Sequence, residues 1–284
     1  MPSYSVNAIN VGSFNLGESD KIITLFSAER GLIRAVAKGA RKPGSKIAGR
    51  AEVLAVNKLL LANGRSLDII TQAETIENFK GIRKDLTRLS YGLYYAELTC
   101  HFGQGLGQEA QSYFELLINA LRQLSLSPDN PAYLCLTFQL SLLHLVGLKP
   151  ELESCLICRR RLLDYDLSIF HHDLGGAVCN TCFSSDVSPK QLRRQNLRLA
   201  ESSSVDIATE TPDKHLSSFF THLTPLVWKK LILASTALSV DKVSNLPSSQ
   251  NSELIEKAIQ AARHLLETYI EHRAGKKMKS LGLI

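Results

Sequence analysis

Four cysteines are the residues whose spacing most clearly indicates a chemistry. They form two Cys-x2-Cys pairs, Cys155 with Cys158 and Cys179 with Cys182, and 20 residues separate the pairs. The thiolates of both pairs can share one ion, and four thiolates leave no open position for substrate or water. The spacing therefore predicts one structural zinc ion and no catalytic metal. Redox-active or simply buried thiols are the alternative interpretations.

The neighbours of these pairs leave two questions open. His171 and His172 lie between the pairs and could displace a cysteine, although four cysteines already complete the shell. Arg159–Arg161 directly follow the first pair and could either contact phosphate or keep it solvated. Cys100 and Cys135 lie on apolar helical faces, where burial as small hydrophobic residues is expected.

A basic stretch follows the third expected strand, and no acidic residue occurs between Glu29 and Glu52. Glycine and proline punctuate it, so we expect an extended loop that lies along a phosphate backbone. Such contacts would be insensitive to sequence and sensitive to salt. A solvated basic face is the alternative. Arg30 is the first basic residue of this stretch. The candidate nucleic-acid-binding residues are the six that follow it: Arg34, Lys38, Arg41, Lys42, Lys46 and Arg50.

Aromatic platforms for bases are sparse near this stretch. Phe14 and Phe26 are candidates for base stacking, although packing in the core is the more ordinary role for each. No residues form a catalytic constellation, and no P-loop, G-x-S-x-G or H-E-x-x-H motif occurs. Gly17–Asp20 is interpreted as a loop-capping element. We therefore predict no catalytic residues and no enzyme activity.

The elements that must position these groups change in type along the chain. The first 80 or so residues contain about five short β-rich runs, with a hairpin signal at Asn63-Gly64, which indicates a small antiparallel barrel or sandwich. Apolar residues at helical spacing then predict a helical bundle. The expected helices span residues 82–103, 111–126, 131–146, 215–238 and 253–273, the last strongly amphipathic, and residues 199–212 form a loop.

Composition agrees with a folded protein that binds a polyanion. Of the 284 residues 44% are hydrophobic and 21% are charged, which is enough for real cores, and the net charge is +6. No secretory signal and no apolar stretch of bilayer length is visible. We therefore expect a soluble cytoplasmic protein, in which the cysteines bind metal or are buried and do not form a disulfide framework.

Three segments resemble the RecO family of DNA repair proteins. The N-terminal signature comprises Leu16–Phe26, Glu29–Gly31 and Ala35–Pro43, and motif, spacing and order all match. Leu67–Glu74 is similar to the closing strand of that family, and Tyr269–Ser280 is similar to its C-terminus. Lys38, Arg41 and Lys42 match basic positions of the family motif, so the resemblance assigns DNA contact to them.

The resemblance implies an α+β multidomain protein. An N-terminal OB-fold would span residues 1–80, and a mainly helical domain would span 81–284 with an inserted four-cysteine zinc module at about 151–186. It also implies binding of single- and double-stranded DNA, annealing of strands without ATP, and loading of the recombinase RecA. RecR, the single-strand-binding protein and RecF are the further partners it implies, at the bacterial nucleoid. The cysteines match the zinc-bearing branch of the family.

A rival hypothesis comes from a different class of protein. A zinc-ribbon adaptor of transcription or translation could use the same basic surface to bind RNA or a polymerase. A preference for RNA over DNA in competition would favour this adaptor. Turnover of nucleic acid by the metal-loaded protein would instead reveal an enzyme.

Overall fold

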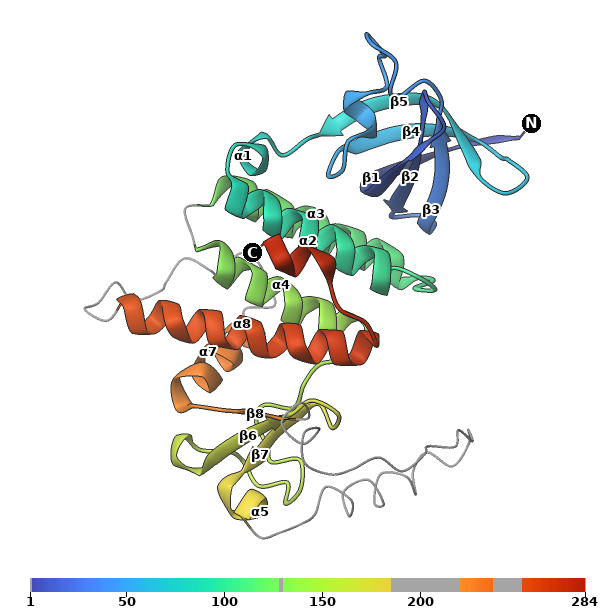
Figure 1. Ribbon diagram of the computed structural model, residues 1–284. Coiled ribbons are helices and arrows are strands. Elements are labelled where there is room, and N and C mark those ends of the chain that lie inside the picture. The colour runs from blue at the N-terminus through green and yellow to red at the C-terminus, as the bar shows by residue number, and fades with distance from the viewer. Residues whose placement is uncertain (1, 128–129, 185–219, 237–251, 284) are drawn as a thin grey trace. The chain divides into compact units, whose positions relative to one another are not determined.

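The computed structural model describes residues 2–127, 130–184, 220–236 and 252–283 (Figure 1). The described chain forms two compact units, one from residues 2–127, 130–147 and 274–283 and one from residues 148–184, 220–236 and 252–273. The loop expected at residues 199–212 lies outside the described residues, and a domain boundary at residue 80 stays a prediction.

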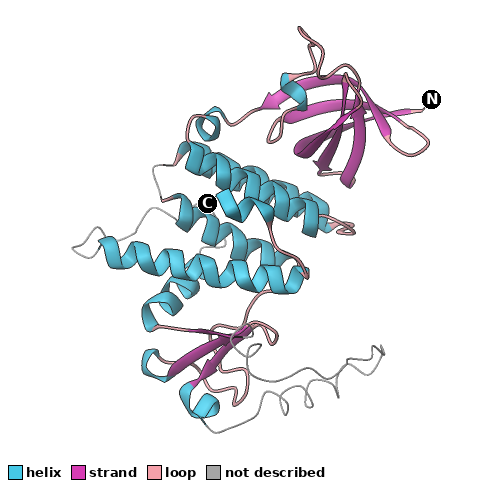
Figure 2. Cartoon of the chain, in the orientation of Figure 1, coloured by secondary structure: helices cyan, strands magenta, loops and turns pink. Residues whose placement is uncertain are grey.

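A closed five-stranded barrel opens the first unit (Figure 2). The strand order is β1-β2-β3-β5-β4, and every pair is antiparallel except β3–β5, which closes the barrel in parallel. The α+β class with an OB-like barrel is thus confirmed. The strands are β1 (Ser3–Leu16), β2 (Asp20–Ser27), β3 (Gly31–Ala37), β4 (Val56–Ala62) and β5 (Asp68–Glu77).

Alternation along the strands sends small and branched apolar residues into the barrel. The interior includes Val6, Ile23, Leu25, Leu59 and Leu61, all of them buried. The Asn63-Gly64 signal lies in the β4–β5 connection as expected, although that connection is longer than a two-residue turn. Asp68 accepts a hydrogen bond from the Gly64 backbone N–H over 3.1 Å, which helps to hold the longer turn.

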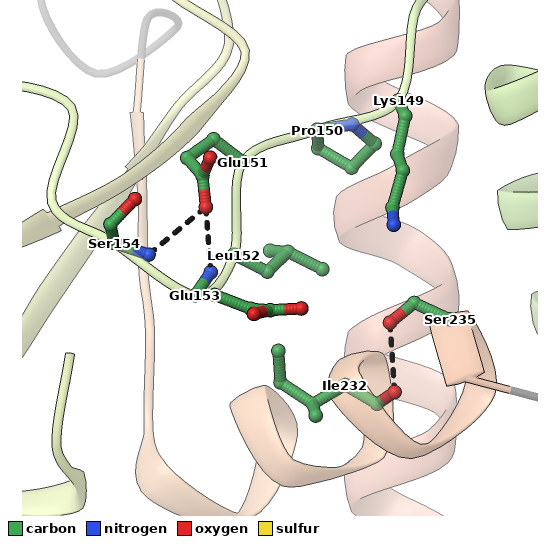
Figure 3. A pocket seen from close by; sticks show the side chains of 8 residues that line it. All are labelled: Lys149, Pro150, Glu151, Leu152, Glu153, Ser154, Ile232 and Ser235. Atoms are coloured by element: carbon green, nitrogen blue, oxygen red, sulfur yellow. Dashed lines mark hydrogen bonds between the residues drawn. The ribbon is translucent and has the colours of Figure 1, made fainter. Parts of the chain in front are cut away.

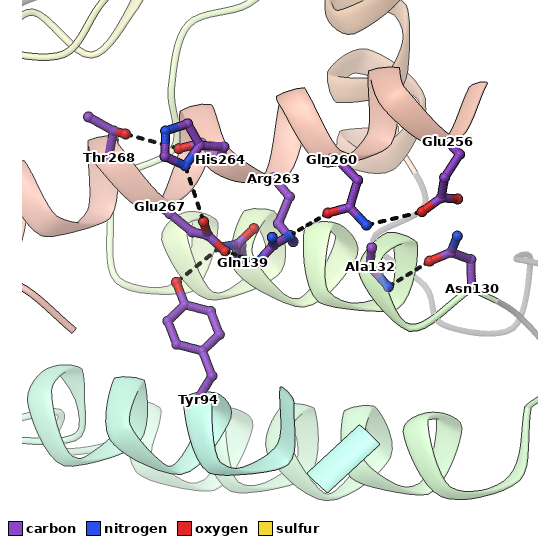
Figure 4. A network of polar contacts seen from close by, with 10 residues as sticks. All are labelled: Tyr94, Asn130, Ala132, Gln139, Glu256, Gln260, Arg263, His264, Glu267 and Thr268. Carbon is purple, nitrogen blue, oxygen red and sulfur yellow. Dashed lines mark hydrogen bonds and ion pairs between the residues drawn. The ribbon is translucent and has the colours of Figure 1, made fainter. Parts of the chain in front are cut away.

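Helices of the first unit follow the barrel. The expected bundle is present as α1 (Lys80–Arg83), α2 (Leu86–Phe102), α3 (Glu109–Leu126) and α4 (Pro131–Leu145), with a short 3-10 helix at Lys279–Leu283. The Asp85 carboxylate caps α2 by accepting from the Arg88 N–H over 3.0 Å. Inside the bundle, the Gln139 amide donates to the Tyr94 hydroxyl over 3.0 Å (Figure 4).

Phe26 joins the barrel to the bundle within this unit. Its side chain is fully buried, and its ring centroid lies 5.0 Å from that of Tyr113 on α3. Gly103, at the end of α2, lies close enough that an added Cβ would be 3.1 Å from the Phe26 ring. Phe26 is therefore a core residue, and the base-stacking alternative is wrong for it.

The second unit is built on a three-stranded sheet in the order β7-β6-β8. The single helix expected over residues 215–238 is wrong at its start, because residues 220–222 form a strand that pairs with β6. Pro225 then begins α7, since proline lacks the N–H that a first helical turn leaves unused. The elements are β6 (Leu167–His171), β7 (Gly176–Cys179), α5 (Asn180–Ser184), β8 (Phe220–His222), α7 (Pro225–Thr236) and α8 (Ser252–Ala274), with a 3-10 turn at Asp164–Asp166.

The amphipathic helix expected at residues 253–273 is confirmed as α8. Its apolar side includes the buried Leu266 and Tyr269, and the Tyr269 ring lies 5.4 Å from that of Phe170 on β6. Its polar side carries hydrogen bonds between residues one turn apart, such as Gln260 to Glu256 over 3.0 Å (Figure 4). Among the described helices, none is long and apolar enough to cross a bilayer.

Candidate functional site

The four cysteines lie together in the second unit. Cys155 and Cys158 precede β6, Cys179 ends β7, and Cys182 lies in α5. All four sulfur atoms lie within 4.8 Å of one another, and those of Cys158 and Cys179 are 3.8 Å apart. Tetrahedral zinc with bonds of about 2.3 Å would place sulfur atoms about 3.8 Å apart. The cluster can therefore hold one metal ion, and its geometry fits zinc.

Backbone amides donate hydrogen bonds to the sulfur atoms of the first cysteine pair. The N–H groups of Ile157 and Cys179 donate to the Cys155 sulfur, each over 3.4 Å. A hydrogen bond from the Arg160 backbone N–H lowers the pKa of Cys158 to about 6, whereas burial raises the pKa of Cys182. The thiolate is the form that binds metal, so the Arg160 amide favours the metal-binding form of Cys158, whereas burial, which raises the pKa of Cys179 and Cys182, opposes it there.

The histidines between the pairs are not members of the cluster that the described residues form. The His172 Nε2 lies 2.9 Å from the Thr221 hydroxyl on β8, and burial lowers the pKa of His172 to about 4. His171 accepts from the Leu174 N–H over 3.5 Å, and both histidines are buried. Each therefore has a structural partner, which supports the four-cysteine set.

A pocket lies beside the segment that precedes Cys155, within the second unit (Figure 3). The Glu151 carboxylate accepts from the N–H groups of Glu153 and Ser154, each over 2.9 Å. These bonds hold the segment that leads into the first cysteine pair. The pocket is lined by Lys149, Pro150, Glu151, Leu152, Glu153, Ser154, Ile232 and Ser235.

The basic stretch forms a compact chain of turns on the first unit, so the expected extended loop is wrong. Consecutive turns are closed by hydrogen bonds such as Lys42 N–H to Gly39 carbonyl over 3.1 Å, and the stretch ends in a 3-10 helix at Gly49–Ala51. Gly39 has a φ of +66°, which few other residues adopt easily. Ala40 and Ala51 are buried in the barrel core, which anchors the loop while its cations face outward.

Polar side chains fix both ends of this loop. The Asp20 carboxylate accepts from the Gly39 N–H over 2.8 Å, and this bond lowers the pKa of Asp20, so its loop-capping role is confirmed. At the far end, the Asn10 and Asn57 amides donate to the Arg50 carbonyl over 2.7 and 2.9 Å. Both asparagines are fully buried. Their polar side chains inside apolar strands were a signal that the sequence interpretation missed.

The six candidate nucleic-acid-binding residues sit on β3 and on this loop. Five of them are exposed and Arg50 is half-buried. Arg41 donates to the Gly17 carbonyl over 2.9 Å, and Arg50 donates to the Lys46 carbonyl over 2.8 Å. Within the described chain, none of the six forms an ion pair with an acidic side chain. Their charges are therefore available to a polyanion.

Comparison with known proteins identifies the family. A family model described as "Recombination protein O N terminal" matches residues 1–79, and one described as "Recombination protein O C terminal" matches residues 83–203. The chain belongs to the RecO family. The first match covers the barrel, and the second covers helices α2 to α4 together with the cysteine cluster.

Three RecO relatives illustrate the extent of the similarity, and each is named "DNA repair protein RecO". The relative from Nostoc punctiforme is 30% identical over 99% of this chain and 95% of its own length. The relative from Pelotomaculum thermopropionicum is 35% identical over 70% of this chain and 76% of its own length. The relative from Nostoc sp. is 39% identical, but the match spans 56% of this chain and about half of that relative, 55%.

Proposed function

We propose that this RecO-family chain is a DNA-binding protein of recombinational repair with no bond-making chemistry of its own. It anneals complementary single strands without ATP and mediates the loading of a recombinase onto strands coated by single-strand-binding protein. The observation that carries the proposal is the exposed basic loop on a closed OB-like barrel, with no acidic residue between Glu29 and Glu52.

Annealing requires two polyanions to approach each other. Loop cations such as Lys38, Lys42 and Lys46 neutralise phosphates and release their counterions, which lowers the repulsion between the strands. Contacts to phosphate carry no sequence information, so any pair of complementary strands can use the same surface. The anchored turns keep these cations in place before DNA arrives, so little ordering is needed on binding.

Partners and cofactor belong to the same proposal. Single- and double-stranded DNA, RecR and the single-strand-binding protein are the proposed direct partners, with RecF and RecA as further ones at the bacterial nucleoid. Zinc is the proposed metal of Cys155, Cys158, Cys179 and Cys182. Its role would be structural, because a closed four-thiolate shell has no position for substrate. The ion would hold the turn before β6 against β7 and α5.

The direct test is annealing of complementary strands, both bare and coated with single-strand-binding protein. The variant Arg41→Ala/Lys42→Ala/Lys46→Ala should lose most annealing. The matched control Lys58→Ala/Lys80→Ala/Lys84→Ala removes three exposed charges from the same unit and should retain it. Annealing that survives in the loop variant would move the site to another surface, with Arg159–Arg161 the next candidate.

The assay also separates the rival functions. Absence of DNA binding at low salt would discard the proposal and favour the RNA or transcription adaptor. A stronger affinity for RNA than for DNA of equal length would do the same. Degradation of either nucleic acid by metal-loaded protein would contradict the non-catalytic assignment.

A further inference from the structure

Phe14 points outward from the barrel because of a bulge in β1. Upstream in β1, Val6 and Ala8 face the interior. The pairing with β2 then shifts between Asn10 and Gly12, so that one extra residue reverses the alternation. Downstream of the shift, Phe14 pairs with Ile22, whose chain neighbour Ile23 is an interior residue, so Phe14 lies on the outer face. Its side chain is 45% exposed.

Arg34 brings a planar cation to the Phe14 ring. Arg34 lies on β3 and pairs with Thr24 of β2, which lies on the same outer face as Phe14. The Arg34 guanidinium carbon is 5.3 Å from the Phe14 ring centroid, and the Arg34 side chain is exposed. An exposed aromatic ring therefore adjoins a cation that has no acidic partner among the described residues.

The same end of the sheet is tied to the basic loop. Phe14 lies two residues before the end of β1, and the turn after β1 binds the loop through the Ser19 carbonyl and the Arg41 N–H, 2.9 Å apart. Lys38 comes four residues after Arg34, directly after the end of β3, and both side chains are exposed. The Phe14 ring thus lies beside Arg34, on a strand that leads directly into the basic loop, and hydrogen bonds hold this loop to the turn after β1.

The packing in the core that was expected for Phe14 is wrong. Phe26 shares the outer face of the barrel but is fully buried against Tyr113, whereas Phe14 remains exposed beside Leu16, which is itself 40% exposed. A purely apolar protein surface would match an apolar patch, but it would leave the unpaired cations around the patch without partners. An unpaired nucleobase stacks on an aromatic ring while its phosphates bind nearby arginine and lysine, which matches both features.

We propose that Phe14 is a base-stacking platform and that Arg34 is the cation that binds the adjacent phosphate of single-stranded DNA. The inference rests on the proposed DNA-binding function and adds to it a defined contact with bases. One unpaired base lies on the Phe14 ring, and the backbone continues past Arg34 and Lys38 onto the basic loop. Duplex DNA cannot use this platform, because its bases are already stacked.

The test compares two oligonucleotides of equal length and charge, oligo-dT and an abasic strand. Wild type should bind oligo-dT more tightly than the abasic strand. Phe14→Ala should weaken binding of oligo-dT by roughly five- to hundredfold and leave binding of the abasic strand unchanged. Phe14→Trp should keep the preference, and its added fluorescence should be quenched by oligo-dT only. Arg34→Ala should weaken binding of both strands alike, because both carry phosphate.

Controls separate failure of this inference from failure of the proposed function. Tyr165→Ala removes another exposed aromatic ring, from the second unit, and should leave both affinities unchanged. If wild type binds neither strand, the DNA-binding function itself fails. If wild type binds both strands and Phe14→Ala retains the preference for oligo-dT, the platform is wrong and the function stands. A preference that Phe14 confers only on oligo-rU would overturn the assignment to DNA.

Discussion

Replacement of Cys155 by serine tests the metal centre. The fully buried Cys155 sulfur belongs to the cluster and accepts hydrogen bonds from two backbone N–H groups. Its replacement by serine therefore removes one of the four ligands of the metal. A bound ion links Cys155 to Cys179 across 24 positions of the chain. Closing a loop of this length contributes about 3.5 kcal/mol to the free energy of unfolding. The small three-stranded sheet offers little core to offset the loss of that link.

Metal content and unfolding measured on the same samples give the answer. Wild type should carry one zinc per chain, and Cys155→Ser should carry much less and unfold at a lower temperature. A strong chelator should lower the unfolding temperature of wild type but not that of Cys155→Ser, since metal binding is coupled to folding. Cys100→Ser, outside the cluster on α2, is the matched control and should keep its metal. Full metal content and unchanged stability in Cys155→Ser would refute the reasoning.

Three further predictions concern the first unit. Asp20→Ala should weaken DNA binding more than Asp20→Asn, because asparagine can still accept from the Gly39 N–H and both variants lose the same charge; equal affinities would show that this bond does not order the loop. Burial opposes ionisation of Glu97, but hydrogen bonds from Ser280 lower its pKa below the usual 4.5. The ionised Glu97 carboxylate therefore stabilises the fold fully above about pH 4.5, and this stabilisation is lost as the pH falls through the lower pKa of the folded state. In urea titrations over this acidic range, the free energy of unfolding of wild type should fall more steeply with pH than that of Glu97→Gln. Phe26→Ala should reduce the free energy of unfolding by about 3–5 kcal/mol, measured by denaturant unfolding, whereas a loss below 1 kcal/mol would contradict its core role.

Local spacing was sufficient to predict the cysteine cluster and the five strands of the barrel. A Cys-x2-Cys pair fixes its own geometry, and the β-rich runs of β2 and β3 are recognisable beside the turn that separates them. The core role of Phe26 was predicted and is confirmed, but the residues that bury it were not predicted, because α3 lies far along the chain. The strand at residues 220–222 was missed for the same reason, since three residues carry no periodicity and gain their pairing from β6.

The loop shows the same division between local and distant information. Its charge was visible in the sequence, but its compact turns depend on Ala40 and Ala51, which pack into a core made by other strands. The outward direction of Phe14 likewise follows from a bulge that only the register with β2 reveals. Sequence therefore identified the groups that can do chemistry, and the pairing of distant strands decided which of them face solvent.

The most direct test of the central claim is the salt dependence of single-stranded DNA binding. Each phosphate neutralised on a single strand contributes about 0.7 to the slope of log affinity against log salt. Arg41→Ala/Lys42→Ala/Lys46→Ala should therefore bind more weakly than wild type, with a slope shallower by about 2. The Lys58→Ala/Lys80→Ala/Lys84→Ala control should keep the slope of wild type. Equal slopes for wild type and the loop variant would contradict the assignment of DNA binding to the basic loop.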